Sequence, residues 1–224
     1  MACPRHPLAA QHGDHCAACL LEEAIGGASE EPAPGARQLR LQVPLGETAS
    51  TSVFLVKSEG SPSRLLRLKV WRRPAEPGFL ARFHQLQHQL DAWDAEDMPR
   101  HLAAVVDAAG CPSVLSDFTR GIPLLDRVRS GRLDPSAAIA CLAPLVALVE
   151  RVHANGLAHG AIVPGNVIVD CDSGRARLLD FGLTPLLVAA YDPAALASSD
   201  CVGFAVLTKT LRNSAIRADS TRGL

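Results

Sequence analysis

The sequence lacks an excess of either charge, with 22 Lys and Arg against 23 Asp and Glu and a formal net charge of -1. This balance excludes a general electrostatic attraction to nucleic acid or to anionic lipid. Long apolar runs are also missing, because Cys141–Val149 falls far short of the roughly 20 residues that span a bilayer, and the N-terminus has no signal-peptide pattern. We therefore expect a cytoplasmic protein that binds neither nucleic acid nor membrane.

What the chain does have is enough apolar material for a core. Its 224 residues are 48% hydrophobic, which suits one substantial domain or two small ones and does not suit a disordered tail. Its seven cysteines are an odd number, and Cys3, Cys16 and Cys19 fall near the N-terminus. That clustering favours metal binding over disulfides.

The N-terminal residues 1–25 contain two ligand pairs, Cys3-x2-His6 and Cys16-x2-Cys19. Zinc prefers tetrahedral sulfur and nitrogen ligands, and a two-residue spacing lets both members of a pair reach one ion. We therefore expect a zinc site, in which His12 or His15 could replace His6; the alternative is a Cys/His-rich tail without metal. Residues 26–37 are rich in Gly, Ala, Pro and Glu and indicate a flexible linker.

The segment His159–Asp170 reads HGAIVPGNVIVD, and Asp180-Phe181-Gly182 follows ten residues later. These motifs and their spacing resemble the core of protein kinases, where H-R-D-L-x-x-x-N supplies a catalytic Asp and a metal-binding Asn, and D-F-G supplies a magnesium ligand. The resemblance implies that Asn166 and Asp180 hold magnesium together with a bound nucleotide. It also extends to residues 1–25, which are similar to the zinc-ribbon-like segment that precedes the kinase domain in a number of bacterial Ser/Thr kinases.

Two positions of the loop depart from the kinase pattern. Ala161 stands at the position of the catalytic Asp, and Val163 at that of the Lys that contacts the transferred phosphate. Removal of a positioned general base costs on the order of 10²- to 10⁴-fold in rate. No catalytic residue is therefore assigned, and efficient phosphoryl transfer is not expected.

The resemblance places a phosphate-binding loop between two β-prone runs. In it Gly46 and Val53 match the family's first glycine and its valine, while Thr48 and Thr51 replace the other two glycines. A loop that brings backbone amides against phosphates needs the space that a missing Cβ leaves, so this loop should hold nucleotide less closely.

Lys69, in the strand-like run Arg64–Trp71, matches the lysine that contacts nucleotide phosphates. Alternation puts Arg67, where kinases usually have Ala, on the same face as Lys69. A guanidinium there would occupy the adenine side of the site. The helical run that begins at Phe79 resembles the helix that carries the lysine's glutamate partner, and Leu86 stands at that position.

Further along, Asp117 and Thr119 match the kinase hinge, which contacts the nucleotide, and Ser116 the residue before it. Residues 134–156 predict a helix with Asp134 as N-cap, a kink at Pro144 and a stop at Gly156. Residues 199–211 resemble a buried kinase helix in which Asp200 is the anchoring carboxylate, and the remaining 13 residues are too few for the rest of that lobe.

We therefore expect an α+β, protein-kinase-like, two-lobed fold, with a β-rich N-lobe and hinge at residues 38–119 and a truncated, mainly helical C-lobe at 120–224. The retained residues are those implied to bind nucleotide and magnesium: Gly46, Val53, Lys69, Asp117, Thr119, Asn166 and Asp180. The leading interpretation is a pseudokinase that binds a protein partner and has residual ATP binding. Two alternatives stay open: an active or weakly active Ser/Thr kinase, and a zinc-containing interaction module that binds no nucleotide.

Overall fold

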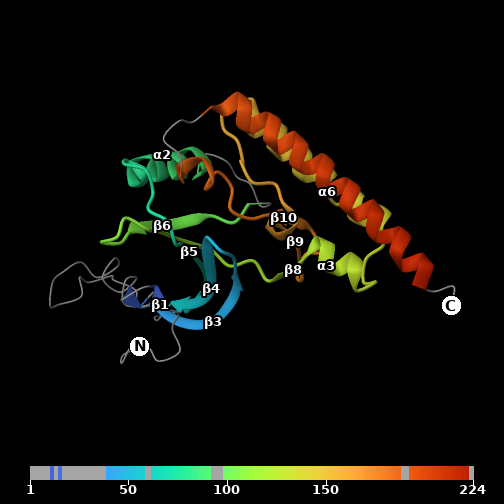
Figure 1. Cartoon of the computed structure of the whole chain (residues 1–224), viewed down its shortest axis with the longest axis horizontal. Coiled ribbons are helices and arrows are strands. Elements are labelled where there is room, and N and C mark those ends of the chain that lie inside the picture. The colour runs from blue at the N-terminus through green and yellow to red at the C-terminus, as the bar shows by residue number, and fades with distance from the viewer. Residues whose placement is uncertain are drawn as a thin grey trace. The chain divides into compact units, whose positions relative to one another are not determined.

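The computed structural model describes residues 11–12, 15–16, 39–58, 62–91, 98–187 and 192–221, with side chains between 39 and 214 (Figure 1). The chain divides into two compact units. Unit 1 comprises Met1–Gln87 and Arg100–Phe118, and unit 2 comprises His88–Pro99 and Thr119–Leu224. Of the N-terminal segment, the described part is a small antiparallel hairpin, β1 (Gln11–His12) and β2 (His15–Cys16).

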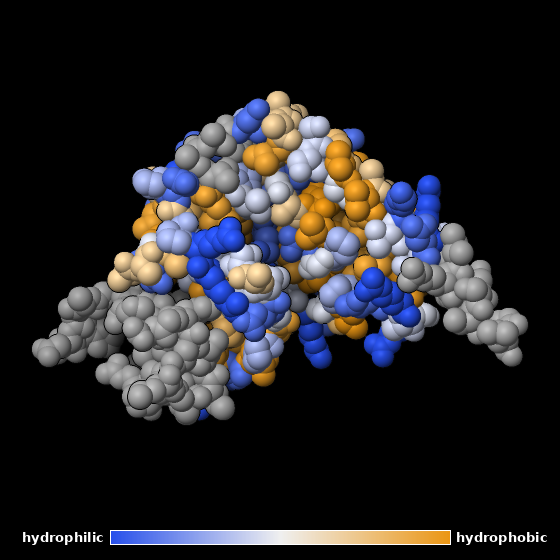
Figure 2. All heavy atoms as spheres, viewed as in Figure 1, coloured by the Kyte–Doolittle hydropathy of each residue, from blue (hydrophilic) through white to orange (hydrophobic). Residues whose placement is uncertain are grey.

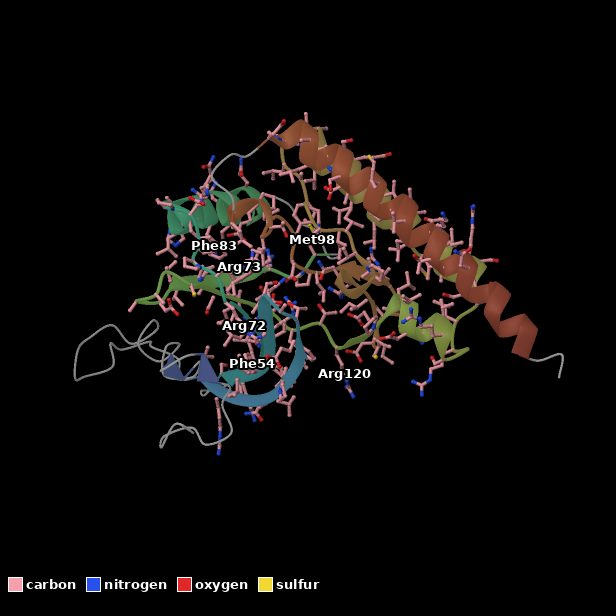
Figure 3. The ribbon with its side chains drawn as sticks, viewed as in Figure 1. Phe54, Arg72, Arg73, Phe83, Met98 and Arg120 are labelled. Atoms are coloured by element: carbon pink, nitrogen blue, oxygen red, sulfur yellow. The ribbon has the colours of Figure 1, made fainter. Side chains whose placement is uncertain are left out.

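Unit 1 is built on a five-stranded antiparallel sheet in the order β3-β4-β5-β7-β6. The strands are β3 (Leu39–Glu47), β4 (Thr51–Ser58), β5 (Leu65–Trp71), β6 (His101–Val106) and β7 (Pro112–Asp117). One face carries an apolar cluster that includes Phe54, Val56 and Leu68, and Figure 3 shows Phe54 within the curve of β3 and β4. Burial of Leu66, Leu68 and Val70, with Arg67 and Lys69 less buried, confirms the alternation predicted for β5.

Helix α2 (Phe79–Asp91) follows the sheet's third strand, as the apolar spacing predicts. Phe79, Phe83 and Leu86 are its buried residues. Figure 3 shows Phe83 reaching from α2 toward β6, where its ring lies 6.3 Å from that of His101. The Gln87 side-chain amide donates to the carbonyl of His101 at 2.9 Å, so a polar contact as well as aromatic packing ties α2 to β6.

Unit 2 combines a small antiparallel sheet in the order β10-β9-β8 with helices. Its strands are β8 (Gly121–Pro123), β9 (Val167–Asp170) and β10 (Ala176–Leu178). Gly174, with φ of 71°, turns the chain between the antiparallel strands β9 and β10. Helix α3 (Leu124–Arg129) follows β8, and the short 3-10 turns η1 (Pro164–Asn166) and η2 (Pro185–Leu187) lie on either side of the hairpin.

The helix predicted at residues 134–156 is divided into α4 (Pro135–Ala140) and α5 (Ala143–His153). Asp134 caps α4 by accepting from the amides of Ser136 and Ala137. Pro144 has no amide proton for a helical bond, so the expected kink becomes a break. By length and composition Pro135–His153 would suffice to cross a membrane, but neither helix alone reaches about 20 residues, and core helices share this composition.

Helix α6 (Pro193–Thr221) is 29 residues long, so the predicted helix at 199–211 was too short. Asp200, Leu207 and Leu211 are fully buried on one side. Gly203 lets the helix approach the chain at Ile162, because a Cβ there would lie 2.5 Å from the Ile162 carbonyl oxygen. On the other side Val202 and Val206 are exposed. Figure 2 shows apolar surface along part of this helix.

Candidate functional site

Asp200 anchors the loop that begins at His159. Its carboxylate accepts from the backbone amides of His159 and Gly160, each at 2.8 Å, and from Nε2 of His153 at 3.0 Å. The carboxylate is fully buried, and these three donors offset the cost of removing its charge from water. The sequence-based expectation of an anchoring carboxylate at Asp200 therefore matches its contacts.

The His159 side chain lies inside the loop and forms a hydrogen bond through each of its ring nitrogens. Its Nδ1 accepts from the Ala161 amide at 3.1 Å, so the proton of the neutral ring lies on Nε2, which donates to the Leu179 carbonyl at 2.8 Å. The ring also meets that of Phe181 edge to face, with the centroids 5.2 Å apart. His159 is fully buried and has a structural role, linking the loop to the segment before Asp180.

Asn166 and Asp180 lie on adjoining stretches of unit 2. The Leu179 amide donates to the Asn166 carbonyl at 2.8 Å, which connects the two stretches immediately before Asp180. The Asn166 side-chain amide donates to the carbonyl of Ala161 at 2.9 Å. These are the two groups that would hold a magnesium ion together with nucleotide, since Mg²⁺ takes oxygen ligands.

Asp180 has a left-handed backbone with φ of 61°, the only such value among the non-glycine residues that the structure describes. The residue is buried, with 3% of its surface exposed. Backbone strain of this kind persists only where the surroundings impose it, and it concentrates at functional sites. The D-F-G segment thus keeps a constrained geometry.

The loop that begins at His159 is held by hydrogen bonds around Ala161, whose side chain carries no carboxylate. The backbone of Ala161 both donates to His159 and accepts from Asn166, yet the side chain is a methyl group. Val163, at the position of the kinase lysine, is 48% exposed. The sequence between His159 and Asn166 contains no Asp or Glu, so no carboxylate of this loop can act as a base.

Gly160 excludes the arginine that kinases have at its position. Its φ is 78°, and a Cβ on it would lie 2.8 Å from Cδ of Pro185. Pro185 is itself buried in the turn after the D-F-G motif. The loop and this turn are therefore packed against each other at a point where a side chain does not fit.

In unit 1, the loop that should cradle phosphates is closed by a threonine hydroxyl. Oγ1 of Thr48 accepts from the amides of Ser50 at 3.2 Å and Thr51 at 3.0 Å, and the Thr48 amide donates to the Thr51 carbonyl. Backbone amides at the tip of the β3-β4 hairpin are thus engaged within the loop. They are less available to a phosphate than those of a glycine-rich loop.

The sheet brings Gly46, Val53 and Lys69 into register, since Gly46 pairs with Val53 and Val53 with Lys69. Nζ of Lys69 lies 5.0 Å from the centroid of the Trp71 ring, a cation-π contact. Leu86, at the position of the kinase glutamate, is buried on α2. An apolar side chain therefore occupies the place from which a kinase would orient this lysine.

The hinge candidates lie at the end of β7 and just after it. Asp117 forms an ion pair with Arg64 at 2.5 Å, while Thr119 is the first residue of unit 2 after the hinge. Ser116 is buried and its hydroxyl hydrogen-bonds Nδ1 of His101 at 2.9 Å. The Asp117 carboxylate is thus committed to a neighbouring strand end.

The zinc candidates Cys3, His6 and Cys19 lie outside the described residues, as does the side chain of Cys16. In the part of the chain that is described, no group of three or more His, Cys, Asp or Glu could hold a metal ion. The residues proposed for magnesium would need ligands from the nucleotide as well. Zinc at the N-terminus therefore stays a prediction.

The chain resembles known protein kinases in sequence, although no family model matches it. It is 26% identical over 170 residues to the Ser/Thr-protein kinase pkn2 of Myxococcus xanthus, covering 74% of this chain and 20% of that protein. It is 36% identical over 73 residues to PknD of Mycobacterium tuberculosis, covering 33% and 10%, and 37% identical over 73 residues to CBL-interacting protein kinase 16 of Oryza sativa subsp. japonica, covering 33% and 16%. The chain thus spans at most about a fifth of the length of these relatives.

The fold is also that of a solved kinase. The kinase domain of Mycobacterium tuberculosis PknI, crystallised as a double mutant, matches with a TM-score of 0.62 and 22% identity, covering 79% of this chain and 73% of that chain. The chain therefore has a protein-kinase-like α+β fold. It is a kinase-like domain, with bacterial Ser/Thr kinases among its relatives.

Several functional features were not foreseen from the sequence. The Thr48 hydrogen bonds were missed, although Thr-x-Ser-Thr at a hairpin tip is a usable signal, because hydroxyls often bond amides two and three residues on. The contact of Lys69 with Trp71 was also missed, although residues two apart in a strand share a face. The Gly160–Pro185 contact had no local signal, since it joins two separate loops.

Proposed function

We propose that this chain is a pseudokinase, a kinase-like binding or regulatory module that does not transfer phosphate efficiently. The observation that carries the proposal is the loop around Ala161, which has a kinase's hydrogen-bonded frame and no carboxylate at the base position. Loss of the base lowers the rate by about 10²- to 10⁴-fold. The apolar Leu86 and Val163 remove two further contributions to the rate of phosphate transfer. These losses are not additive with the loss of the base.

A phosphate-transfer assay tests this proposal. The full chain is incubated with radiolabelled ATP, magnesium and a generic protein substrate, beside the Asp180→Ala and Ala161→Asp variants. We expect the wild-type chain to transfer no more label than the Asp180→Ala variant. Ala161→Asp should also stay near background, because Val163, Leu86 and the closed Thr48 turn remain. Wild-type transfer that Asp180→Ala abolishes would establish instead the alternative, an active or weakly active Ser/Thr kinase.

That alternative has one favourable observation, the retention of Asn166 and Asp180 on adjoining stretches with Asp180 in a constrained backbone conformation. Under the pseudokinase proposal, the same two residues hold magnesium and nucleotide phosphates without turnover. A thermal shift with ATP and magnesium measures this binding. No shift at millimolar ATP would favour the remaining alternative, an interaction module that binds no nucleotide.

The proposal includes zinc at the N-terminus, a protein partner and a cytoplasmic location, with no role in nucleic-acid or membrane binding. The zinc ligands are Cys3, His6, Cys16 and Cys19, as their spacing suggests. The β1-β2 hairpin supports the arrangement, because it follows the pair Cys3-x2-His6 and ends at Cys16, the first residue of the second pair. A non-catalytic module acts through what it binds, which is why a protein partner belongs to the proposal.

A further inference from the structure

The exposed side of α6 carries a regular row of small and apolar residues. The members of this α6 row stand alternately three and four residues apart, and all are exposed: Ala195, Ser198, Val202 and Ala205. This is the spacing of the two seam positions of a coiled coil, which places side chains in one line along a helix. Val202, with Val206 beside the row, is 60% and 54% exposed respectively, and no described large apolar side chain is more exposed. The α6 row therefore has the pattern of a packed seam while it faces solvent.

Charge is absent from this side along residues 193–208 and has opposite signs at the two ends. Within that range the one charged residue is Asp200, which is fully buried on the other side, where α6 packs against α3, α4 and α5. Asp192 precedes the α6 row, while Lys209 and Arg212 follow it, and all three are exposed. A helix face that stays in water ordinarily carries charged and polar side chains along its length. The gap in charge favours an interface on this side.

The end charges select both the occupant and its direction. In a parallel pair of α6 helices, Lys209 would lie against Lys209 of the second copy, and Asp192 against Asp192. In an antiparallel pair, the basic end of each helix lies beside the acidic start of the other, so attraction replaces repulsion. The helix macrodipoles also oppose each other in that direction. A second, antiparallel copy of the chain thus complements this side at both of its ends.

The spacing of the α6 row also gives a register. When the pair is centred between Val202 and Ala205, each of these residues lies opposite the other in the second copy, so that a larger side chain meets a smaller one. In the same register Arg212 of one copy lies opposite Ala195, within one turn of Asp192 of the other. Small residues along the row allow the helix axes to approach to about 8 Å. Because the large apolar residues of this side are two valines, we expect the association to be weak.

We propose that this side of α6 is a homodimer interface, in which two copies of the chain pair their α6 helices antiparallel about a twofold axis. Such an interface uses the same surface on both copies, so it closes at two chains. The proposal goes beyond the pseudokinase function and does not depend on it, because no residue of the α6 row belongs to the loop at His159 or to the D-F-G segment.

Sedimentation velocity of the full chain over a wide range of concentration tests the proposal. We expect the average mass to rise from that of one chain to that of two as the concentration increases. Val202→Arg places like charges at the centre of the pair and should weaken association at least about tenfold. The matched control is Leu80→Arg, which puts the same charge at an exposed apolar position of α2 and should leave association unchanged.

Charge reversal tests the direction of the pair. In the antiparallel arrangement, Lys209→Glu brings an acidic side chain toward the Asp192 end of the second copy, so its own dimer should be weaker than that of the wild type. An equal mixture with the wild type should have intermediate affinity. In a parallel arrangement the mixture would associate more tightly than either protein alone, and that result would overturn the proposed pairing.

Misfolding is excluded as a cause by urea denaturation of each variant at low concentration, where the single chain predominates. The urea midpoints of Val202→Arg, Leu80→Arg and Lys209→Glu should then match that of the wild type. A wild-type chain that stays a monomer at every concentration, or a Val202→Arg variant that dimerises as the wild type does, would contradict the interface. Either result leaves the pseudokinase proposal standing, since only phosphate transfer contradicts that.

Discussion

Asp200 is the residue on which the loop frame of unit 2 depends. Asp200→Ala leaves the amides of His159 and Gly160 without their acceptor. At about 1 to 3 kcal/mol for each buried unpaired amide, we expect the free energy of unfolding to fall by about 2 to 6 kcal/mol in urea denaturation. Asp200→Asn keeps one acceptor oxygen and should lose less.

The exposed Asp192 provides the comparison, since it accepts from the amides of Ala194 and Ala195 at the start of α6. Asp192→Ala should cost only about 1 kcal/mol, as other N-caps do. Equal losses for Asp200→Ala and Asp192→Ala would contradict the anchoring role.

Gly160 allows backbone strain and side-chain crowding to be measured separately. Gly131 has φ of 68° and open space where a Cβ would be, whereas a Cβ on Gly160 meets Pro185. Gly131→Ala should therefore cost about 1 to 2 kcal/mol from strain alone. Gly160→Ala should cost about 1 to 3 kcal/mol more, because of overpacking. Similar values by urea denaturation would show that Pro185 moves aside.

Asp170 should contribute to the acid sensitivity of unit 2. Hydrogen bonds from the Ser173 and Asp172 amides, together with the Arg177 guanidinium 2.8 Å away, hold the pKa of Asp170 below its usual range, against the opposing effect of burial. A carboxyl with a lower pKa in the folded chain stabilises the fold above its unfolded pKa of about 3.9. That contribution is lost as the pH falls through the folded-state pKa.

The Asp170→Asn variant tests this sign, because its side chain does not titrate. We expect the free energy of unfolding to fall less steeply from about pH 4 downward than in the wild type. The measurement is a series of urea titrations between neutral and acidic pH. Parallel curves for the two proteins would mean that Asp170 adds nothing to the acid response.

At the scale of elements, α6 has an exposed side that should tolerate substitution and a buried side that should not. Val202 and Val206 are exposed, so Val202→Lys and Val206→Lys should change the free energy of unfolding by no more than about 0.5 kcal/mol. Leu207 is fully buried, and Leu207→Ala should cost about 2 to 5 kcal/mol. Thermal unfolding measures all three. A large loss from either valine variant would show that this side is packed in solution.

Local patterns predicted several of the strands and helices, and their failures have physical causes. The Asp134 cap depends on near neighbours, so spacing alone locates it. The break before α5 was underestimated because the missing Pro144 amide proton costs a helical bond in a short helix. The length of α6 was missed because its last turns carry little apolar periodicity.

At the scale of the whole molecule, the family pattern predicted the fold and the motif positions, while contacts between separate segments did not follow from it. Asn166 and Asp180 were identified as candidates because their motif spacing is specific. The engagement of the loop amides by Thr48 depends on the hairpin geometry, and that of Asp117 by Arg64 depends on strand pairing. A sequence pattern states which residue stands at a position, whereas its contacts follow from folding.

The zinc proposal concerns the full chain and is tested on it. Metal analysis of the purified protein should give about one zinc per chain, and Cys16→Ser with Cys19→Ser should reduce this to near zero. Because structural zinc stabilises the segment that binds it, proteolysis of residues 1–25 should quicken in that variant. Metal-free wild-type protein that is unaffected by a chelator would dispose of the site.

The carboxylate of Asp200 also sets an order of events during synthesis. It lies 41 and 40 residues after the two amides that it holds, so the loop at His159 emerges from the ribosome well before its anchor. At roughly 5 to 20 residues per second, those amides wait about 2 to 8 s for their partner. The loop therefore cannot reach its anchored geometry before residue 200 has been made, and a nascent chain stalled earlier would present it without its anchor to chaperones and proteases.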